Sequence, residues 1–353
     1  MEQAAKRFQL WCIGLCVLFS AGLNAQIFPG LEGEDLVEAL QNSYTPQVLL
    51  NDTQVKDTLY AKVFIEGDSV KCIYSGLAHD LPTGVDPSQY VFGSGNQTES
   101  INLEHGWPQA KGAGDGTDGN MNMYHLFPSR VAINSDRADF PYRQIADNVT
   151  NHWYYRGIEM SSKPSSNIDA YSEFFPGSFE PRESVKGDIA RAMFYFWTIY
   201  RDDAIAADPG YFDQMKTDLC TWHEQDPADA FEILRNERIA VYQDGKSNPF
   251  ITDCSLVRRA YCSQLGTCFN TATSEDNHNS DQLRYSQADH EFLITSDETG
   301  PWKLIVISLL GQVIMSEKVL AGERIEAIHL QPGFYVAIAT NGNRTIRTSL
   351  VTF

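Results

Sequence analysis

Two runs of sequence carry the residues that decide the fold of the central region: residues 101–109 read INLEHGWPQ, and residues 122–141 read NMYHLFPSRVAINSDRADFP. Glu104 and His105 are adjacent in the first run, and His125 lies in the second. Neighbouring side chains of a strand point to opposite faces, but at a strand end or a bulge they flank one site. A carboxylate beside an imidazole supplies a metal ligand and a proton acceptor near neutral pH. These three residues are therefore the candidate active site, although a single histidine more often has a structural role.

Helical periodicity marks the region around these runs. In residues 184–201 apolar side chains recur every three or four positions, which predicts a helix with one buried face. Residues 227–242 predict a second helix, residues 33–43 a short amphipathic helix, and residues 70–74 a strand. The sequence contains no internal repeat and no Gly-rich phosphate loop. We therefore predict an α+β region over residues 26–270 that contains the chemistry.

The chain changes character after residue 270. Residues 271–287 read TATSEDNHNSDQLRYSQ, a polar segment that we interpret as a linker. Residues 288–353 contain short alternating runs of apolar residues that glycines separate at regular intervals. This pattern predicts a small all-β sandwich. The strand candidates are residues 302–310, 312–319, 324–330 and 334–340.

Length and charge limit the classes of function. The chain has 353 residues, enough for about two domains of ordinary size. With 27 Lys and Arg against 46 Asp and Glu, the net charge of −19 argues against a protein that coats nucleic acid through bulk positive charge. An enzyme that grips a few phosphates in a local cleft is still compatible with this charge. No run of about 18 apolar residues follows the N-terminus, so we expect no membrane span in the mature protein.

The first 25 residues have the layout of a secretory signal peptide. Lys6 and Arg7 precede a short apolar stretch at residues 10–23, and Ala25 is the small residue before the expected cut. An N-terminal anchor helix is the alternative, which the shortness of the apolar stretch disfavours.

Five cysteines follow the expected cut, and export permits disulfides. An odd number leaves at least one thiol unpaired or paired between chains. Cys254, Cys262 and Cys268 lie close together in the sequence, with spacings that match no common zinc site. We therefore expect one local disulfide among them, with the pairing open. The other two cysteines are Cys72 and Cys220.

Several motifs in order resemble the bacterial endonuclease I family of secreted and periplasmic nucleases. They lie within residues 60–255 and read LEHGWPQ, HLFPS, INSDR, VKGDIARAMFY, WHEQDPAD, RNERI and SNPF. The resemblance implies a mainly helical nuclease domain with a ββα-metal core over residues 26–270. In that core a strand presents a histidine, the following helix presents a metal ligand, and one divalent cation lies between them.

The resemblance also implies roles for individual residues. His105 resembles the general base that activates water, and Glu104 and His125 resemble the metal ligands. Some members of the family carry a catalytic arginine between the base and the helix, but residues 106–124 contain none. Arg137 is the residue we expect to stabilise the transition state instead, with Arg130 as the alternative. The residues expected to bind substrate are Asn134, Lys111 and Arg130.

One divalent cation and a histidine base suffice to hydrolyse a phosphodiester without a nucleophilic side chain. Mg²⁺ is the expected ion, and a histidine ligand also admits Mn²⁺ or another transition ion. We expect a secreted endonuclease that cuts DNA without sequence preference, with RNA as a second candidate substrate, and that leaves 5′-phosphate ends as the family implies. The alternatives are an inactive secreted binding or adhesion module with the same fold, and a phosphodiesterase that acts on small molecules.

The C-terminal segment resembles the sorting domain of the type IX secretion route in the Bacteroidetes. The resemblance rests on KLIVISLLGQVI at residues 303–314, HLQPGFYVAIAT at residues 329–340 and RTSLV at residues 347–351. It implies the type IX machinery as a partner and a secreted or cell-surface protein, which we expect to be a monomer. A carbohydrate-binding or adhesive sandwich is the alternative.

Overall fold

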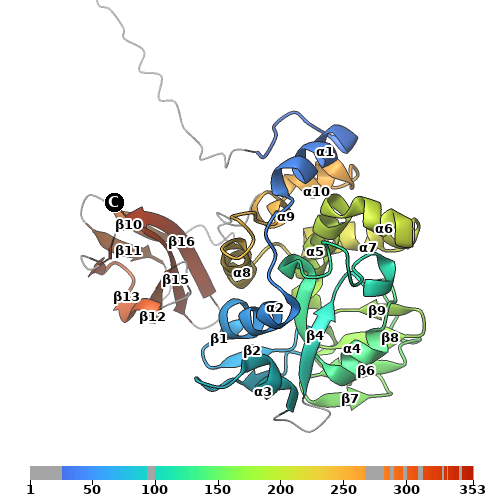
Figure 1. Ribbon diagram of the computed structural model, residues 1–353. Helices are drawn as coiled ribbons and strands as arrows, with labels where there is room; N and C mark the ends of the chain where they lie inside the picture. The colour runs from blue at the N-terminus through green and yellow to red at the C-terminus, as the bar shows by residue number, and fades with distance from the viewer. Residues whose placement is uncertain are drawn as a thin grey trace, which may run out of the picture.

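The computed structural model describes residues 26–93, 100–266, 282–286, 290–296, 300–308, 313–327, 330–331, 333–341 and 344–352. The expected signal peptide at residues 1–25 and most of the expected linker at residues 271–287 lie outside the described residues. Figure 1 shows a region of mixed helix and sheet up to residue 266 and a smaller region of strands after it. No helix among the described residues is both long enough and apolar enough to cross a membrane.

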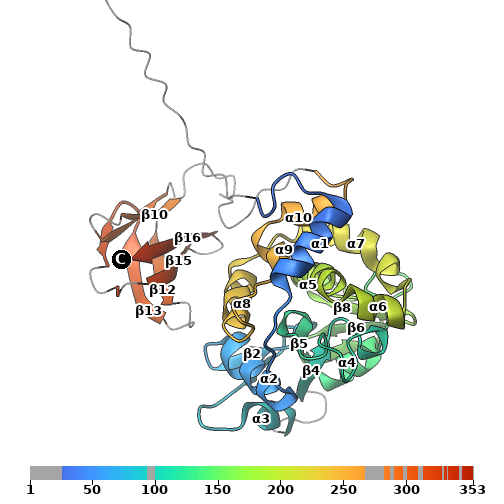
Figure 2. The ribbon, with the colours of Figure 1, turned by 45° about the horizontal axis from the view of Figure 1, so that its top comes forward.

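Helix α5, Lys186–Ile199, is the buried centre of the first region. Its sequence KGDIARAMFYFWTI places apolar side chains around almost the whole helix axis, so the helix must be covered on all sides. Helices α7, Tyr211–Gln225, and α1, Gly33–Tyr44, pack against it. Helix α1 also lies beside α10, Ser255–Ala260, as Figure 2 shows.

The helices expected at residues 184–201 and 227–242 are confirmed as α5 and as α8, Ala230–Ala240. The amphipathic helix expected at residues 33–43 is confirmed as α1. Within the described residues the other helices are α2 Asp52–Thr58, α3 Pro87–Gly93, α4 Val131–Arg137, α6 Arg201–Ala207 and α9 Pro249–Thr252. Shorter turns are the π-helix η1 Leu59–Val63 and the 3₁₀ turns η2 Gln109–Lys111, η3 Met123–His125, η4 Ile168–Ala170 and η5 Glu183–Val185.

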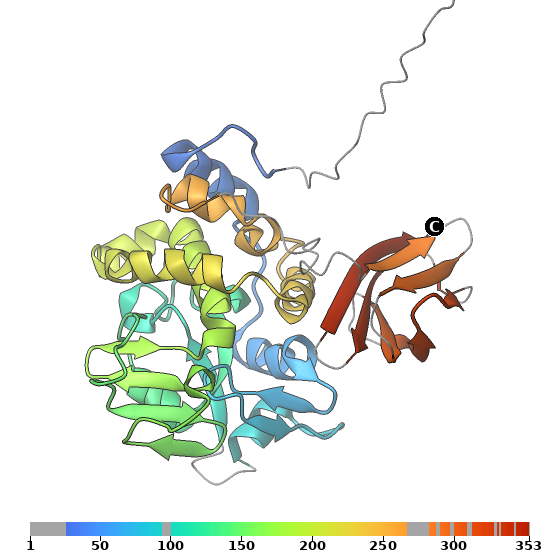
Figure 3. The same ribbon diagram turned by 180° about the vertical axis from the view of Figure 1, so that it is seen from behind.

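Strands β1 to β9 lie in the same part of the chain, so the first region is mixed rather than mainly helical. A small antiparallel sheet contains β1 Ile65–Glu66, β2 Ser69–Lys71 and β3 Ala78–Asp80. The strand expected at residues 70–74 is shorter than expected, because the chain turns where the N–H of Gly76 donates to the carbonyl of Cys72. A four-stranded antiparallel sheet, seen from behind in Figure 3, has the order β7-β6-β8-β9. Its strands are β6 His152–Tyr155, β7 Ile158–Met160, β8 Ser172–Phe175 and β9 Ser178–Glu180.

The C-terminal region has its own hydrophobic core and two sheets, of order β10-β11-β14 and β13-β12-β15-β16. Each expected strand of this region coincides with an observed one, namely β12, β13, β14 and β15. Strand β10 falls in the segment expected as a linker, because Leu283 and Tyr285 alternate with polar residues and pair with β11. The strands are β10 Gln282–Ser286, β11 Glu291–Thr295, β12 Pro301–Ser308, β13 Val313–Leu320, β14 Arg324–Glu326, β15 Gly333–Asn341 and β16 Arg344–Thr352.

The disulfides connect distant parts of the first region. Cys262 pairs with Cys220 on α7, 42 residues earlier, and not with a neighbour in sequence. Cys254 is disulfide-bonded as well, while Cys268 lies outside the described residues. Cys72 is a buried free thiol. Of the three cysteines that lie close together in the sequence, Cys262 therefore forms a long-range disulfide, which sequence spacing does not reveal.

Candidate active site

A hairpin and a helix place the candidate residues. Strand β4, Ile101–His105, pairs antiparallel with β5, Leu126–Arg130, so that Glu104 lies opposite Phe127 and His105 opposite Leu126. Strand β5 continues directly into helix α4, Val131–Arg137, which packs against both strands. The chain thus forms two antiparallel strands followed by a helix.

Gly106 follows β4 at a place where a side chain would be crowded on three sides. A Cβ at this position would lie 3.0 Å from the carbonyl oxygen of His125, 3.1 Å from Cε of Met193 and 3.2 Å from the Phe127 ring. Its N–H donates to the same carbonyl of His125 at 2.8 Å. Trp107 follows and stacks on Phe196 at 4.9 Å, so packing holds the chain just after His105.

His105 is half-buried and has one ring nitrogen free to accept a proton. Its Nε2 lies 3.1 Å from the carbonyl oxygen of Asn120, which assigns the ring proton to Nε2. Its Nδ1 makes no hydrogen bond with the part of the chain that the structure describes, and it is not sealed from solvent. Burial lowers the pKa of His105 to about 4, although the Asn120 carbonyl acts in the opposite direction. The ring is therefore neutral at pH 7, as a proton acceptor must be.

Glu104 is buried on the side of the hairpin that faces α4. Its Oε1 accepts a hydrogen bond from the Tyr74 hydroxyl at 2.7 Å and lies 3.4 Å from Nε of Arg137. The Tyr74 hydroxyl lies 2.6 Å from that of Tyr142. Burial raises the pKa of Glu104, while Arg137 and the tyrosine hydroxyls oppose the rise. The carboxylate is thus held in one orientation beside a compensating guanidinium.

Asn134 is the residue of α4 that offers an oxygen beside β4. Its Nδ2 donates to Oδ1 of Asn102 at 2.9 Å and to the carbonyl of Leu103 at 3.2 Å. Its Oδ1 accepts no hydrogen bond within the described residues. Arg137, one helical turn later, contacts Glu104, and Asn102 shares a strand face with Glu104. Glu104 of β4 and Asn134 of α4 therefore each carry a side-chain oxygen at the contact between these two elements.

His125 is not placed as the sequence suggested. It ends the turn η3 before β5, whereas the helix that follows the strands is α4. Its Nε2 lies 2.7 Å from the carbonyl of Gly119, and its Nδ1 is buried without a partner. Within the described residues, ligand atoms of Glu104, His105 and His125 do not all lie within 4.8 Å of one another. We expected Glu104 and His125 to hold one ion with the His105 ring beside it, and this pairing stays a prediction, although His125 is buried and its Nε2 is taken by the Gly119 carbonyl.

Arg137 is buried and contacts backbone. One terminal nitrogen donates to the carbonyls of His105 at 3.3 Å and Ala138 at 3.1 Å, and the other donates to Gly106 at 2.6 Å. Its side chain is 1% exposed. These contacts place the Arg137 guanidinium at the end of β4, and its expected role toward a phosphate stays a prediction.

Arg130 and Lys111 are also engaged within the protein. Arg130 is buried, and one of its terminal nitrogens donates to the carbonyl of Arg156 at 3.1 Å. Lys111 Nζ lies 3.0 Å from Asp208 and 3.7 Å from Asp139, and the hydrogen bond to Asp208 raises the pKa of Lys111. Both cations are thus paired within the protein, and their expected role in binding substrate stays a prediction.

Comparison with known proteins matches residues 41–255 to the family described as Endonuclease I. The chain belongs to the endonuclease I family. It is 32% identical to an extracellular ribonuclease of Bacillus subtilis (strain 168) over 178 residues, which are 45% of this chain and 53% of that protein. It is also 32% identical to an extracellular deoxyribonuclease of Aeromonas hydrophila over 130 residues, 37% of this chain and 48% of that protein. The chain therefore spans about half the length of the curated relatives it matches.

For this endonuclease I family member, sequence reasoning missed the surroundings of Glu104. Tyr74 and Tyr142 lie far from Glu104 in the sequence, and nothing in their local pattern marks them. The position of Asn102 on the same strand face as Glu104 could have been inferred from the sequence, because side chains two positions apart in a strand share a face. The Asn120 carbonyl that orients His105 belongs to the backbone, so residue identity could not reveal it.

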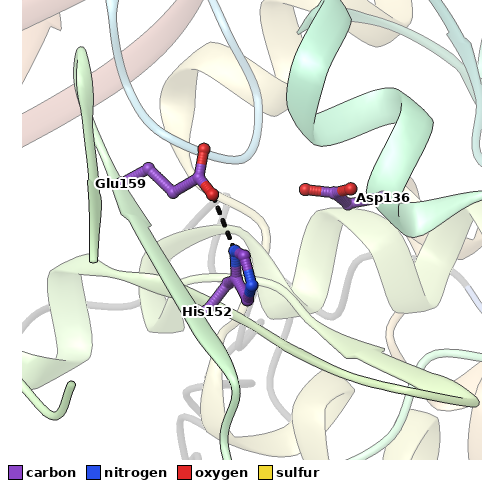
Figure 4. Close-up of side chains that lie close together, drawn as sticks. All are labelled: Asp136, His152 and Glu159. Atoms are coloured by element: carbon purple, nitrogen blue, oxygen red, sulfur yellow. Dashed lines mark hydrogen bonds and ion pairs between the residues drawn. The ribbon is translucent and has the colours of Figure 1, made fainter. Parts of the chain in front are cut away.

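A different set of side chains has the spacing of metal ligands. Of the described His, Cys, Asp and Glu residues, the group with ligand atoms all within 4.8 Å of one another is Asp136, His152 and Glu159, drawn in Figure 4. Asp136 lies two residues after Asn134 on α4, so its side chain leaves the helix in a different direction. This group is separate from the space beside Glu104.

Proposed function

We propose that this chain is a secreted, divalent-metal-dependent endonuclease that hydrolyses the phosphodiester bonds of DNA, and of RNA as a second substrate, without sequence preference. The observation that carries the proposal is the β4–β5–α4 unit, which presents a neutral histidine at the end of β4 and oxygen donors between β4 and α4. Membership of the endonuclease I family supports it. The relatives named extracellular ribonuclease and extracellular deoxyribonuclease support secretion and both classes of substrate.

Glu104 and Asn134 would hold the cation, with one carboxylate and one amide oxygen. The family resemblance implies a ligand on the helix that follows the strands, and α4 is that helix, so Asn134 takes the role first assigned to His125. Oxygen donors suit Mg²⁺, with Mn²⁺ as the next choice. A bound divalent ion neutralises the charge that develops on the phosphate and on the leaving oxygen.

His105 would take a proton from the attacking water at Nδ1 while its Nε2–H stays bonded to the Asn120 carbonyl. The hydroxide would attack phosphorus as the bond to the 3′ oxygen breaks, and the leaving oxygen would take a proton from solvent water, which gives a 5′-phosphate and a 3′-hydroxyl. General-base help of this kind contributes roughly 10²–10⁴ in rate. Arg137 is a positioning residue here, because it holds the carbonyls of His105 and Gly106.

Substrate affinity in this proposal depends mainly on the divalent ion. The net charge is −19, and Arg130, Arg137 and Lys111 are occupied by protein groups. These three cations are therefore not free for contacts with a phosphate backbone, which fits a modest affinity for nucleic acid. We also keep the proposal of a monomer that the type IX machinery exports through its C-terminal sandwich, whose strands suit such a domain.

Plasmid nicking by the purified full-length chain tests the proposal. We expect nicking with Mg²⁺, loss of nicking with EDTA, and a fall of roughly 10²-fold or more for His105→Ala. His79→Ala is the matched control, because His79 is another partly exposed histidine beside a strand backbone, and it should nick at the wild-type rate. Parallel assays on single-stranded RNA compare the two substrates.

Intact plasmid with both Mg²⁺ and Mn²⁺, identical for wild type and His105→Ala, would reject the enzyme in favour of a binding module that keeps the fold. Cleavage of a nitrophenyl phosphodiester with sparing of plasmid and RNA would point instead to a small-molecule phosphodiesterase.

A further inference from the structure

We propose a second divalent-cation site, formed by Asp136, His152 and Glu159, that binds Zn²⁺ and fastens α4 to the sheet beneath it. The three ligands come from three elements: α4, β6 and β7. The site does not rest on the proposed function, since none of its residues belongs to the group around Glu104 and His105.

The sheet presents two of the ligands side by side. Tyr154 lies opposite Glu159 in the β6–β7 ladder, and His152 is two residues before Tyr154, so these three side chains share one face. The Nδ1 of His152 lies 2.7 Å from Oε1 of Glu159. Figure 4 shows the imidazole and this carboxylate joined by that contact, with Asp136 facing them from α4.

Asp136 is held above the same face by Tyr154, whose hydroxyl donates to Oδ2 at 2.5 Å. This bond orients the carboxylate before any ion binds, and such outer partners are typical of metal sites. One carboxylate oxygen remains for an ion. The tyrosine therefore connects the helix ligand to the strand that carries the histidine.

The charge of the group favours a divalent cation. Two carboxylates and a neutral imidazole carry a charge of about −2, and within the described residues no lysine or arginine forms an ion pair with Asp136 or Glu159. A mixed nitrogen and oxygen set suits Zn²⁺, and Mn²⁺ after it, better than Mg²⁺ or Ca²⁺. The side chains of His152 and Glu159 are 39% and 42% exposed, so an ion can enter and water can complete its coordination.

Small movements would complete the site. Around a tetrahedral zinc with bonds of about 2.1 Å, ligand atoms lie about 3.4 Å apart. The Nδ1 of His152 and Oε1 of Glu159, now 2.7 Å apart, would separate slightly, and ligand atoms that lie farther apart within the 4.8 Å limit would approach. Exposed side chains can shift by that amount. A surface His–Glu pair alone adds little stability, whereas an ion shared with α4 ties separate elements together.

Calorimetric titration of the EDTA-treated full-length chain with Zn²⁺ tests this proposal. We expect wild type to bind one equivalent of Zn²⁺ at this site. Glu159→Gln and His152→Ala should lose this equivalent or bind it at least about tenfold more weakly. Zn²⁺ should also raise the unfolding temperature of wild type more than that of either variant. Glu66→Gln, which alters another exposed carboxylate in an ion pair, is the matched control and should behave as wild type.

Equal Zn²⁺ stoichiometry and affinity in wild type, Glu159→Gln and His152→Ala would overturn the site. Asn134→Ala distinguishes this site from the one proposed at Glu104 and Asn134, because the variant should still bind the Zn²⁺ equivalent of the second site. If Asn134→Ala removes the Zn²⁺ that Glu159→Gln retains, the ion binds beside Glu104 and the second site does not exist. Failure of the proposed function would be seen separately, as absence of nicking.

Discussion

His105 and His125 lie with their ring centroids 5.7 Å apart, and each has Nε2 on a backbone carbonyl. Their Nδ1 atoms differ. That of His125 is buried without a partner, whereas that of His105 is not sealed from solvent. Only a nitrogen that reaches water can take its proton, so these surroundings support our proposal that His105, rather than His125, is the base.

The first prediction concerns the ion ligand on α4. Asn134→Ala should lower Mn²⁺ affinity by roughly 10–100-fold, because it removes the amide oxygen, while Asn134→Asp should retain binding. His125→Gln should change the affinity little. Paramagnetic titration in a Glu159→Gln background measures the affinity without the second site. Retained binding in Asn134→Ala together with loss in His125→Gln would restore His125 as the ligand.

The second prediction concerns the pH profile. Burial lowers the pKa of His105 to about 4, so the neutral base persists far below pH 6.5. At saturating Mg²⁺, which keeps Glu104 ionised, the nicking rate should stay level from pH 8 to about pH 5 and then fall as the ring protonates. An acid limb centred near pH 6.5, with the fold intact by circular dichroism, would show that His105 titrates as an ordinary exposed histidine.

At the scale of elements, other parts of the chain pack against the hairpin of β4 and β5. Helix α4 covers one face of β4, where Arg137 holds the last carbonyls of the strand. On the other side, Met193 of α5 approaches Gly106, and Phe196 of the same helix stacks on Trp107. The position of His105 therefore depends on a buried helix far away in the sequence.

The third prediction follows from this close approach. Gly106→Ala should lower the free energy of unfolding by about 1–3 kcal/mol, because the new methyl group meets the His125 carbonyl, Met193 and Phe127. It should also slow nicking by displacing His105. Gly157→Ala is the control, since its Cβ would meet nothing within 4 Å. Urea unfolding measures the free energy of unfolding of both variants. Equal values would mean that the hairpin accommodates the added methyl group without cost.

At the scale of the whole molecule, two hydrophobic cores serve two regions. The first contains the buried residues around α5, and the second contains Trp302, Phe292 and their neighbours in the C-terminal sheets. Polar side chains are also buried away from water in the first region, among them the imidazoles of His125 and His223. Stability of the first region therefore depends on pH.

The fourth prediction uses His223, whose Nε2 lies 3.1 Å from the Cys254 carbonyl and whose pKa is lowered by burial to about 3. The unfolded chain binds this proton near pH 6.5 and the folded chain does not, so stability is lost as the pH falls below about 6.5. The effect of Glu173 on stability changes with pH in the opposite direction. Burial raises the pKa of Glu173 to about 7, so its contribution to folding stability is lost as the pH rises through that value.

The difference between wild type and His223→Gln isolates the histidine. Between pH 7 and pH 5 wild type should lose about 2 kcal/mol more free energy of unfolding than the variant, as measured by urea unfolding. The same loss in both proteins would mean that His223 titrates normally in the folded chain.

The sequence by itself determined the local features, namely the helices α5 and α8 and the strands of the C-terminal region. Periodicity and short motifs suffice for these, because they depend on residues close in the chain. Only the tertiary structure decided that Asn134 faces β4 while His125 is enclosed, that Cys262 reaches Cys220, and that Asp136 meets His152 and Glu159. Each of these depends on which distant backbone or side chain packs against the residue, and local pattern carries no record of that contact.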